Sequence, residues 1–369
     1  MNRFQVLLTI SVVFFTFSAF GQVRKFSNEF LTIPVNARGM AMSEAVNASV
    51  DDVSSAFYNP AGLIRLQTDL EVAFTHTEYF AGVSKYDYIA FALPFDDGRR
   101  SLALSMIRFA VDDIPNTLDL IEDDGSINYD NIKSFSVGDY AFLLTYAQKT
   151  GIENLNVGGN VKIVYRRAGS FANSIGFGID IGGQYQHKEW LFAITAKDIT
   201  TTFNAWSFHF TEEEKQTLAV TNNEIPENSL ELTAPSLHFS AAYDYLVKEK
   251  FGILPEIKMT VTTDGKRNTL IQSDPLSIDL SLGLELHYQR IIFLRGGIGN
   301  FQRATDDYGE KTYSFQPNIG LGFKLNNFLF AENLKVDYAF SDIGNQSETL
   351  YSHVISIVAS INRKNKQGK

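Results

Sequence analysis

Hydrophobic and polar residues alternate strictly over many segments of this chain. From Leu276 to Tyr288, large apolar residues fill every second position, and small, polar or charged residues fill the positions between them. The pattern recurs at 174–185, 157–166 and 318–325. Successive strand side chains point to opposite faces, so each strand has one apolar and one polar face. These runs exceed the about five or six residues usual in soluble sheets. They fit tilted bilayer crossings and predict a transmembrane β-barrel.

The pattern predicts an all-β fold, an antiparallel barrel of about fourteen strands, an even number as in single-chain bacterial barrels. The predicted strands are 68–79, 84–94, 100–109, 137–149, 155–167, 174–187, 189–199, 236–247, 253–263, 276–289, 291–301, 312–325, 329–341 and 350–361.

The connections between these strands alternate in length. Short links occur at 150–152, 187–189, 289–290 and 326–328, and long ones at 110–136, 200–235, 264–275, 302–311 and 342–349. Outer-membrane barrels have short periplasmic turns and long extracellular loops. The alternation therefore predicts that both termini are periplasmic, including the basic tail 363–369, although the link 80–83 is short on the side of the long loops.

The N-terminus has the pattern of a secretory signal peptide. Arg3 precedes an apolar stretch from Val6 to Phe17, and the small residues Ala19 and Gly21 precede a predicted cut before residue 22. The alternative, a transmembrane anchor, needs about 20 apolar residues, more than this stretch has. Export of a chain without spanning helices predicts the outer membrane of a Gram-negative cell.

Residues 22–67 do not alternate and precede the barrel, predicted at 68–362. We predict that they form a hatch that fills part of the lumen, with short helices within 41–56; a periplasmic extension is the alternative. Its motif Asn59, Pro60, Ala61 and Gly62 predicts a fixed turn into the first strand, with Gly62 free to take a positive φ; the alternative is ligand contact. Asp51 and Asp52 are candidates to latch the hatch by ion pairs with Lys162, Arg166 or Lys324, or else to be solvated.

The amino-acid composition excludes or disfavours several classes of function. The chain has no Cys, which excludes disulfides and thiolate metal sites, and its net charge of −10 disfavours nucleic-acid binding. Its 30 Phe and 16 Tyr would supply the aromatic girdles of a barrel. The six His are scattered and no phosphate-binding or nucleophile motif occurs, so we predict a non-enzyme without catalytic residues, cofactor or metal. The acidic stretch 112–130 resembles a calcium loop in composition only, because Ile121 takes a ligand position.

The connection 200–235 carries the candidate partner-binding residues Phe203, Trp206, Phe208 and Phe210. Clustered aromatic residues on a loop are typical of binding sites. Thr211 and Glu214 have the spacing of a capping box, which predicts a short helix after them. The alternative is that these aromatics belong to the outer girdle of the barrel.

Two sets of residues resemble known families. The string from Asn36 to Met40, followed by the one from Ala48 to Leu63, resembles the N-terminal signature of FadL-type barrels. Blocks 78–88, 114–117 and 200–208 resemble the PorV/PorQ-like outer-membrane family of Bacteroidota. The first resemblance implies a hatch inside a fourteen-stranded barrel. The second implies a component or accessory of type IX protein secretion, with secretion-system proteins or exported cargo domains as partners beside the membrane lipid.

The main hypothesis from the sequence is this secretion role, with partners held by the extracellular loops. The alternative is FadL-like transport of a hydrophobic small molecule. FadL proteins release substrate through a kink in the third strand, but Ser101 to Phe109 contains neither Gly nor Pro. The predicted lumen is also charged, which suits internal ion pairs better than fatty acids. Its ionisable residues are Asp139, Lys162, Arg166, Asp180, Asp279, Glu285, Lys324, Lys335 and Asp337.

Overall fold

The wall of the molecule is one antiparallel sheet that closes on itself. The computed structural model describes residues 27–80, 82–122, 125–305, 310–328, 331–342 and 351–362. Strand β1 pairs with β2 on one side and with β17 on the other, in a register that sets Leu70 opposite Ile361. Around the closed wall the order is β1 to β7, then β10, then β12 to β17. The predicted antiparallel barrel of fourteen strands is therefore confirmed.

Among the described residues, seventeen strands make up this sheet, because three short strands add to the fourteen of the wall. The bounds are β1 (Leu70–Tyr79), β2 (Ser84–Phe95), β3 (Arg100–Asn116), β4 (Lys133–Lys149), β5 (Leu155–Ala168), β6 (Ala172–His187), β7 (Trp190–Lys197), β8 (Thr202–Phe208), β9 (Ser229–Thr233), β10 (Ser236–Tyr243), β11 (Tyr245–Val247), β12 (Phe251–Thr262), β13 (Ser277–Tyr288), β14 (Ile292–Thr305), β15 (Lys311–Phe328), β16 (Ala331–Asp342) and β17 (Tyr351–Ile361).

The two faces of the wall have the polarity that the alternation predicts. On β13, Leu282 and Leu284 point outward and are 46% and 42% exposed, whereas Ser281, Glu285 and His287 point inward and are less than 9% exposed. Other wall strands expose Ile, Leu and Phe in the same way. An apolar band around a closed barrel matches the hydrocarbon core of a bilayer. The protein is therefore an outer-membrane barrel.

Two predicted loops are wrong in part, because the sheet continues through them. β3 runs on to Asn116 and β4 starts at Lys133, since a register shift between Val111 and Ile114 lets the ladder continue beyond the predicted strand end. The connection 200–235 contains β8 and β9, which extend the wall by pairing with β6 and with each other. The aromatic residues Phe203, Trp206 and Phe208 therefore lie on a strand and not on a loop.

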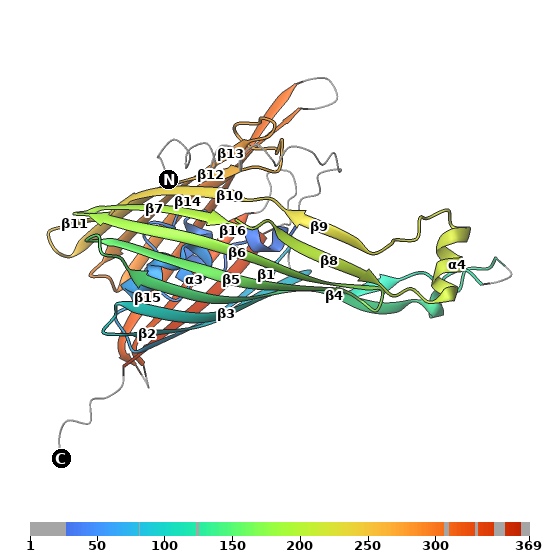
Figure 1. Cartoon of the computed structure of the whole chain (residues 1–369), viewed down its shortest axis with the longest axis horizontal. Helices are drawn as coiled ribbons and strands as arrows, with labels where there is room; N and C mark the ends of the chain where they lie inside the picture. The colour runs from blue at the N-terminus through green and yellow to red at the C-terminus, as the bar shows by residue number, and fades with distance from the viewer. Residues whose placement is uncertain are drawn as a thin grey trace, which may run out of the picture.

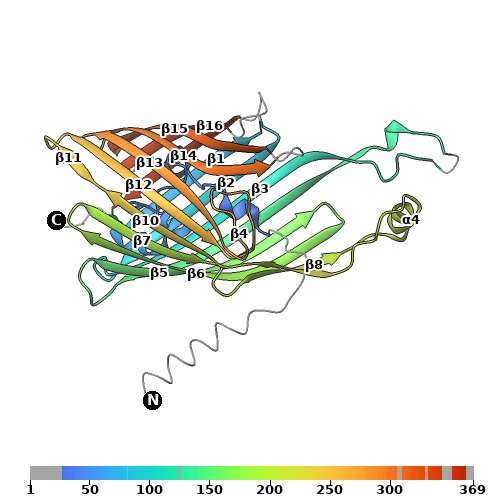
Figure 2. The ribbon, with the colours of Figure 1, turned by 90° about the horizontal axis from the view of Figure 1, so that it is seen from above.

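The two ends of the barrel differ in the length of their connections. At the short-turn end, 96–99, 150–154 and 289–291 join neighbouring strands. At the long-loop end lie 117–132, 263–276 and the long hairpin, which we define as residues 202–233 with helix α4 (Glu212–Val220) between β8 and β9. The β3–β4 hairpin and the long hairpin project well beyond the other strands at that end (Figures 1 and 2).

Residues 27–66 lie inside the barrel, and we call them the hatch. They form η1 (Glu29–Thr32), α2 (Ala37–Ala41), α3 (Ser55–Tyr58) and η2 (Pro60–Arg65), joined by turns, and most of their side chains are buried. Their short helices are drawn in blue within the wall strands (Figure 1). In the described part of the chain, no helix has both the length and the apolar character needed to cross a membrane.

Glycines on the inner face of the wall make room for the hatch backbone. A Cβ on Gly158 of β5 would lie 2.6 Å from the carbonyl carbon of Pro60, and one on Gly297 of β14 would lie 2.5 Å from that of Met42. Real Cβ atoms do not approach backbone so closely, so only Gly fits at these positions. The hatch therefore docks on two glycine surfaces, one on β5 and β6 and the other on β13, β14 and β15.

Gly297→Ala is expected to destabilise the docked hatch by about 1–3 kcal/mol, because the added methyl group overlaps backbone that cannot move aside. The neighbouring Gly296 points outward, and its Cβ would meet nothing closer than 3.9 Å, so Gly296→Ala is the matched control. Limited proteolysis of the purified barrels at the hatch measures the difference. Equal protease resistance in both variants would show that the glycine surface does not hold the hatch.

Candidate functional site

A polar cavity of about 690 Å³ lies between the hatch and the wall, on the side of the long-loop end. Hatch residues 27–34 line one side of it, and strands β7, β10, β12 and β13 line the other. Residues 264–269 of the β12–β13 loop also line it, so the cavity extends from the hatch to that loop. Its volume is that of a small-molecule site. We take it as the candidate functional site.

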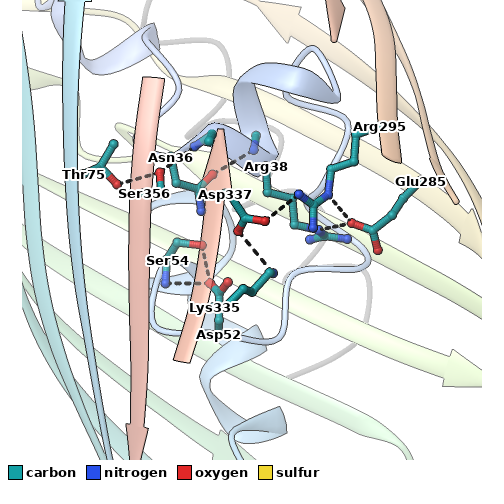
Figure 3. Close-up of polar contacts among 12 residues, drawn as sticks. Asn36, Arg38, Asp52, Ser54, Thr75, Glu285, Arg295, Lys335, Asp337 and Ser356 are labelled. Carbon is teal, nitrogen blue, oxygen red and sulfur yellow. Dashed lines mark hydrogen bonds and ion pairs between the residues drawn. The ribbon is translucent and has the colours of Figure 1, made fainter. Parts of the chain in front are cut away.

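The hatch is anchored to the wall below this cavity by a buried ion-pair network (Figure 3). Arg38 of α2 donates to Glu285 of β13 over 3.0 Å, and Arg295 of β14 donates to the same carboxylate over 2.5 Å. Arg295 also binds Asp337 of β16 over 2.7 Å, with Lys335 3.7 Å from that carboxylate. The side chains of Arg38, Glu285, Arg295 and Asp337 are all at most 7% exposed. The network thus joins the hatch to three strands.

Two further wall carboxylates accept hydrogen bonds from the hatch backbone. Glu256 of β12 accepts from the amides of Ala48 (2.7 Å) and Ser49 (3.2 Å). Glu71 of β1 accepts from the amide of Val53 over 2.7 Å. These bonds satisfy backbone donors in turns that have no helical partner, as buried donors require. The wall therefore holds the hatch by its main chain as well as by its side chains.

The Asn59 motif forms a turn, as the sequence predicts, and also contacts the wall. Asn59 is fully buried and caps η2 by accepting from the amide of Ala61, while Pro60 takes the first helical position. Its amide nitrogen donates to the carbonyl of Gly183 on β6 over 3.1 Å. The expected positive φ of Gly62 is wrong. Gly62 is instead required for close packing, because a Cβ there would lie 2.7 Å from the carbonyl oxygen of Val50.

The predicted latch does not form with the residues we expected. Asp51 is exposed, and Asp52 is buried but accepts from the amide and hydroxyl of Ser54 within the hatch. A short aspartate side chain caps a local turn more readily than it reaches across a lumen. Lys324, at the short-turn end, has no carboxylate within 4.0 Å among the described residues. Two other hatch residues form the ion pairs to the wall: Arg38 pairs with Glu285 of β13, and Glu44 pairs with Lys258 of β12.

Lys162 stabilises the junction between β7 and β8. Its ammonium lies 2.8 Å from Asp180 of β6 and 2.5 Å from Asp198, which follows β7. Asp198 also receives a hydrogen bond from the hydroxyl of Thr202, the first residue of β8. The cluster therefore fixes the break between β7 and β8, and Lys162 is fully occupied by internal partners.

The predicted partner-binding aromatics are divided between the two faces of the wall. Phe203 faces outward. Trp206 and Phe208 share the inner face with Asn204, and their rings form a row with Phe210 and Phe171 at centroid distances of 5.8–6.2 Å. The inner-face members are therefore not part of an outer aromatic girdle. The predicted helix is confirmed, because Thr211 and Glu214 form the capping box of α4.

Arg166 and Asp139 meet beside this aromatic row. The Arg166 guanidinium makes two hydrogen bonds to Asp139, of 2.9 and 3.1 Å, and reaches Glu231 of β9 at 3.3 Å. Its carbon lies 5.2 Å from the centre of the Trp206 ring, in a cation–π arrangement. Arg166 therefore ties β4, β5, β8 and β9 together on the inner face.

The first residues of the hatch reach the long hairpin. Asn204 of β8 donates to Ser27 and Asn28 over 3.0 Å, and Glu29 binds Arg267 of the β12–β13 loop over 3.0 Å. Burial alone would lower the pKa of Arg267, but Asp264 and Glu29 beside it raise that pKa above its ordinary value. Residue 22, the predicted mature N-terminus, lies outside the described residues.

We next consider whether the described residues form a metal site or a kink for lateral release. Within them, no group of three His, Asp or Glu side chains is placed to hold a metal ion. The acidic stretch 112–130 includes residues 123 and 124, which lie outside the described part. The third strand is continuous, since β3 keeps its register with both β2 and β4 from Arg100 to Val111. A kink for lateral release is therefore absent from this stretch of β3.

Comparison with known proteins gives matches in structure alone. No family model matches the sequence, and no curated protein matches it significantly. The CymD monoaromatic hydrocarbon channel matches with a TM-score of 0.54 at 13% identity, over 92% of this chain and 100% of that chain. The toluene transporter TodX of P. putida gives 0.54 at 10% identity, over 89% and 99%. The toluene transporter TbuX of Ralstonia pickettii gives 0.53 at 11% identity, over 89% and 98%.

At 10–13% sequence identity, these matches show a shared fold and nothing more. The expected FadL-like barrel fold is confirmed, because the matched structures share the fold over 89–92% of this chain. No match supports the narrower PorV/PorQ-like assignment, which stays a prediction. By name, these three are a channel and two transporters.

Proposed function

We propose that the protein transports a small molecule across the outer membrane, by way of the polar cavity and a movable hatch. The cavity above a docked hatch carries this proposal, because it provides a binding volume on one side of a closed lumen. The transport function of the matched channels supports it. The long-loop end would face the outside, as in other outer-membrane barrels, so that solute enters the cavity from there.

The lining of the cavity favours a polar solute over the hydrocarbons in the names of the matched channels. Its lining includes Lys197 and Asp279, neither of which has an oppositely charged side chain within 4.0 Å in the described part of the chain. An apolar ligand would remove water from these ionised groups without replacing their hydrogen bonds, which is unfavourable. Passage inward requires the hatch to move, because its anchors hold it across the lumen in the docked state.

A cross-link between the hatch and the wall is expected to stop transport. Cβ atoms at Ser43 and Gly299 would lie 3.1 Å apart, near the separation of about 3.5–4.5 Å in disulfides, and the chain has no other Cys. Proteoliposome swelling in polar solutes should be lost in oxidised S43C/G299C and return on reduction. The single-cysteine variants are the controls. Swelling that is equal in the oxidised and reduced double variant would contradict the proposed movement of the hatch.

The secretion role is a second candidate, favoured by the long hairpin. Among described residues, β9 pairs only with β8, so its other edge carries unpaired backbone groups that can accept a strand of a partner. The aromatic row starts on β8, the strand that pairs with β9. Deletion of residues 203–232 removes the edge of β9 and the aromatic residues of β8 and leaves the fourteen wall strands in place, because the flanking Thr202 and Thr233 are paired neighbours. Type IX secretion subunits or cargo that co-purify with the wild type and not with this deletion would support the role. Identical co-purification would argue against it.

A further inference from the structure

Most of the ionised side chains on the cavity wall are already neutralised by protein partners. Each of the paired cations has at least one carboxylate oxygen within 4.0 Å, and these pairs are part of the scaffold described above. They are Lys162 with Asp180 and Asp198, Lys258 with Glu44, and Arg267 with Glu29 and Asp264. Such groups are poorly suited to recognise a solute, because a solute would have to compete with an existing ion pair.

Lys197 is the exception among the cations on the wall strands. It is the last residue of β7, and it lines the cavity. Among the described residues, no carboxylate oxygen lies within 4.0 Å of its ammonium nitrogen, which sits 4.1 Å from the centre of the Phe57 ring. A cation–π contact compensates only part of the hydration that an ammonium group loses. Lys197 therefore presents hydrogen-bond donors that an anionic group in the cavity can satisfy.

Asp279 is the corresponding exception among the anions. It lies on the inner face of β13, lines the same cavity and is half-buried. The carboxylate accepts from the amide of Leu280 over 2.9 Å and from the backbone of Phe301, and no cation of the described residues lies within 4.0 Å of it. Because an ionised carboxylate can accept about four hydrogen bonds, Asp279 keeps the capacity to bind a cationic group.

The two groups are too far apart to pair with each other. Register places Lys197 opposite Ser236, Ser236 opposite Thr262, and Thr262 opposite Ser277, two residues before Asp279. Neighbouring strands lie ~4.8 Å apart, so these three steps span about 14 Å along the wall. Both side chains reach into the cavity and shorten this span. An extended peptide covers at most ~3.6 Å per residue, so a peptide of about two to four residues bridges it.

We propose that the cavity binds a short zwitterionic peptide, with its carboxylate on Lys197 and its ammonium group on Asp279. This inference rests on the proposed transport function and names its substrate class. A solute with both charges neutralises both of these wall-strand groups at once, whereas a hydrocarbon neutralises neither. The volume of about 690 Å³ accommodates a ligand of this size.

Calorimetry with the full-length mature protein in detergent tests the proposal with three probes. These are trialanine, N-acetyl-trialanine, which lacks the ammonium charge, and trialanine amide, which lacks the carboxylate. The wild type is expected to bind trialanine about tenfold more tightly than either analogue, as charge-assisted hydrogen bonds imply. Lys197→Met should bind trialanine and its amide equally, and Asp279→Asn should bind trialanine and its N-acetyl form equally.

The pattern across the variants separates recognition from damage to the fold. Lys197→Met should still bind trialanine more tightly than N-acetyl-trialanine, and Asp279→Asn should still bind trialanine more tightly than trialanine amide. Lys324→Met removes a lysine at the other end of the barrel and should keep the preference for trialanine over both analogues. A wild type that binds the three probes equally, or fails to bind trialanine, would overturn the proposal. So would variants that weaken all three probes alike.

The same peptides in the swelling assay separate this inference from the transport function. Swelling in uncharged solutes together with no charge preference in calorimetry would overturn the peptide site and leave the transporter. Selective peptide binding without any swelling would support the site and argue against transport.

Discussion

Replacing Glu285 with glutamine is expected to destabilise the protein by about 3–5 kcal/mol and to loosen the hatch. The Glu285 carboxylate is the only partner shared by Arg38 of the hatch and Arg295 of the wall in the described network, and it is buried together with both guanidinium groups. Loss of its charge leaves Arg38 without its ion-pair partner, and leaves Arg295 with Asp337 alone in the described network. Removing one member of a buried ion pair is costly because the other stays desolvated. Urea unfolding, followed by heat-modifiable gel mobility, measures the change.

A double-mutant cycle with Arg38→Met separates the wall from the hatch. Arg38→Met removes the hatch partner but leaves Glu285 paired with Arg295, so we expect a smaller loss of stability and faster proteolysis of the hatch. Glu249→Gln, at an exposed turn, is the control and should change stability by less than about 0.5 kcal/mol. If Glu285→Gln unfolds at the urea concentration of the wild type, the network does not hold the barrel.

The barrel itself could be predicted from the sequence because its signal is local. Each wall strand needs only alternate apolar positions, and a lipid-facing side chain needs no particular partner. The missed parts, which are β8, β9 and the long ends of β3 and β4, project at the long-loop end of the barrel (Figure 1). Outside lipid, the outer face is no longer required to be apolar, so strand and loop look alike in the sequence.

The pairings inside the lumen could not be predicted in the same way. Alternation places Glu285, Asp180 and Lys162 on the inner face, but the choice of partner depends on the stagger between distant strands and on the path of the hatch. The prediction accordingly named Asp51 and Asp52 as latch residues and did not include Arg38, although Arg38 lies in the signature string from Asn36 to Met40. Arg295 was also missed. Its position between Phe293 and Gly297 on one face of β14 was the available signal.

Inward-facing glycines are a further signal that the sequence offered. Gly158, Gly182, Gly283, Gly297 and Gly320 fall at inward positions of their strands, where a barrel with an empty lumen has no need for them. Their common role appears only when the hatch is present, because each would bring its Cβ to within 3.0 Å of a hatch atom. Glycine on the polar face of predicted barrel strands is therefore a useful indicator of a plug.

Lys162→Met is expected to cost about 3–5 kcal/mol, because it leaves the carboxylates of Asp180 and Asp198 facing each other without a cation between them. Lys162 is only 3% exposed, so water does not easily replace the ammonium group. The damage should begin at the junction of β7 and β8, where Asp198 also binds Thr202. Hydrogen exchange at β8 and urea unfolding of the whole barrel measure the local and the global effect.

Charge, rather than packing, should account for most of this loss. Lys162→Met keeps the length of the side chain, and the triple variant K162M/D180N/D198N removes the unbalanced carboxylates as well. The triple variant is expected to recover most of the stability, since replacing a whole buried ion cluster by neutral groups is often close to neutral. If the triple variant is as unstable as Lys162→Met, the ammonium group acts through its packing, and the ion cluster does not fix the break in the wall.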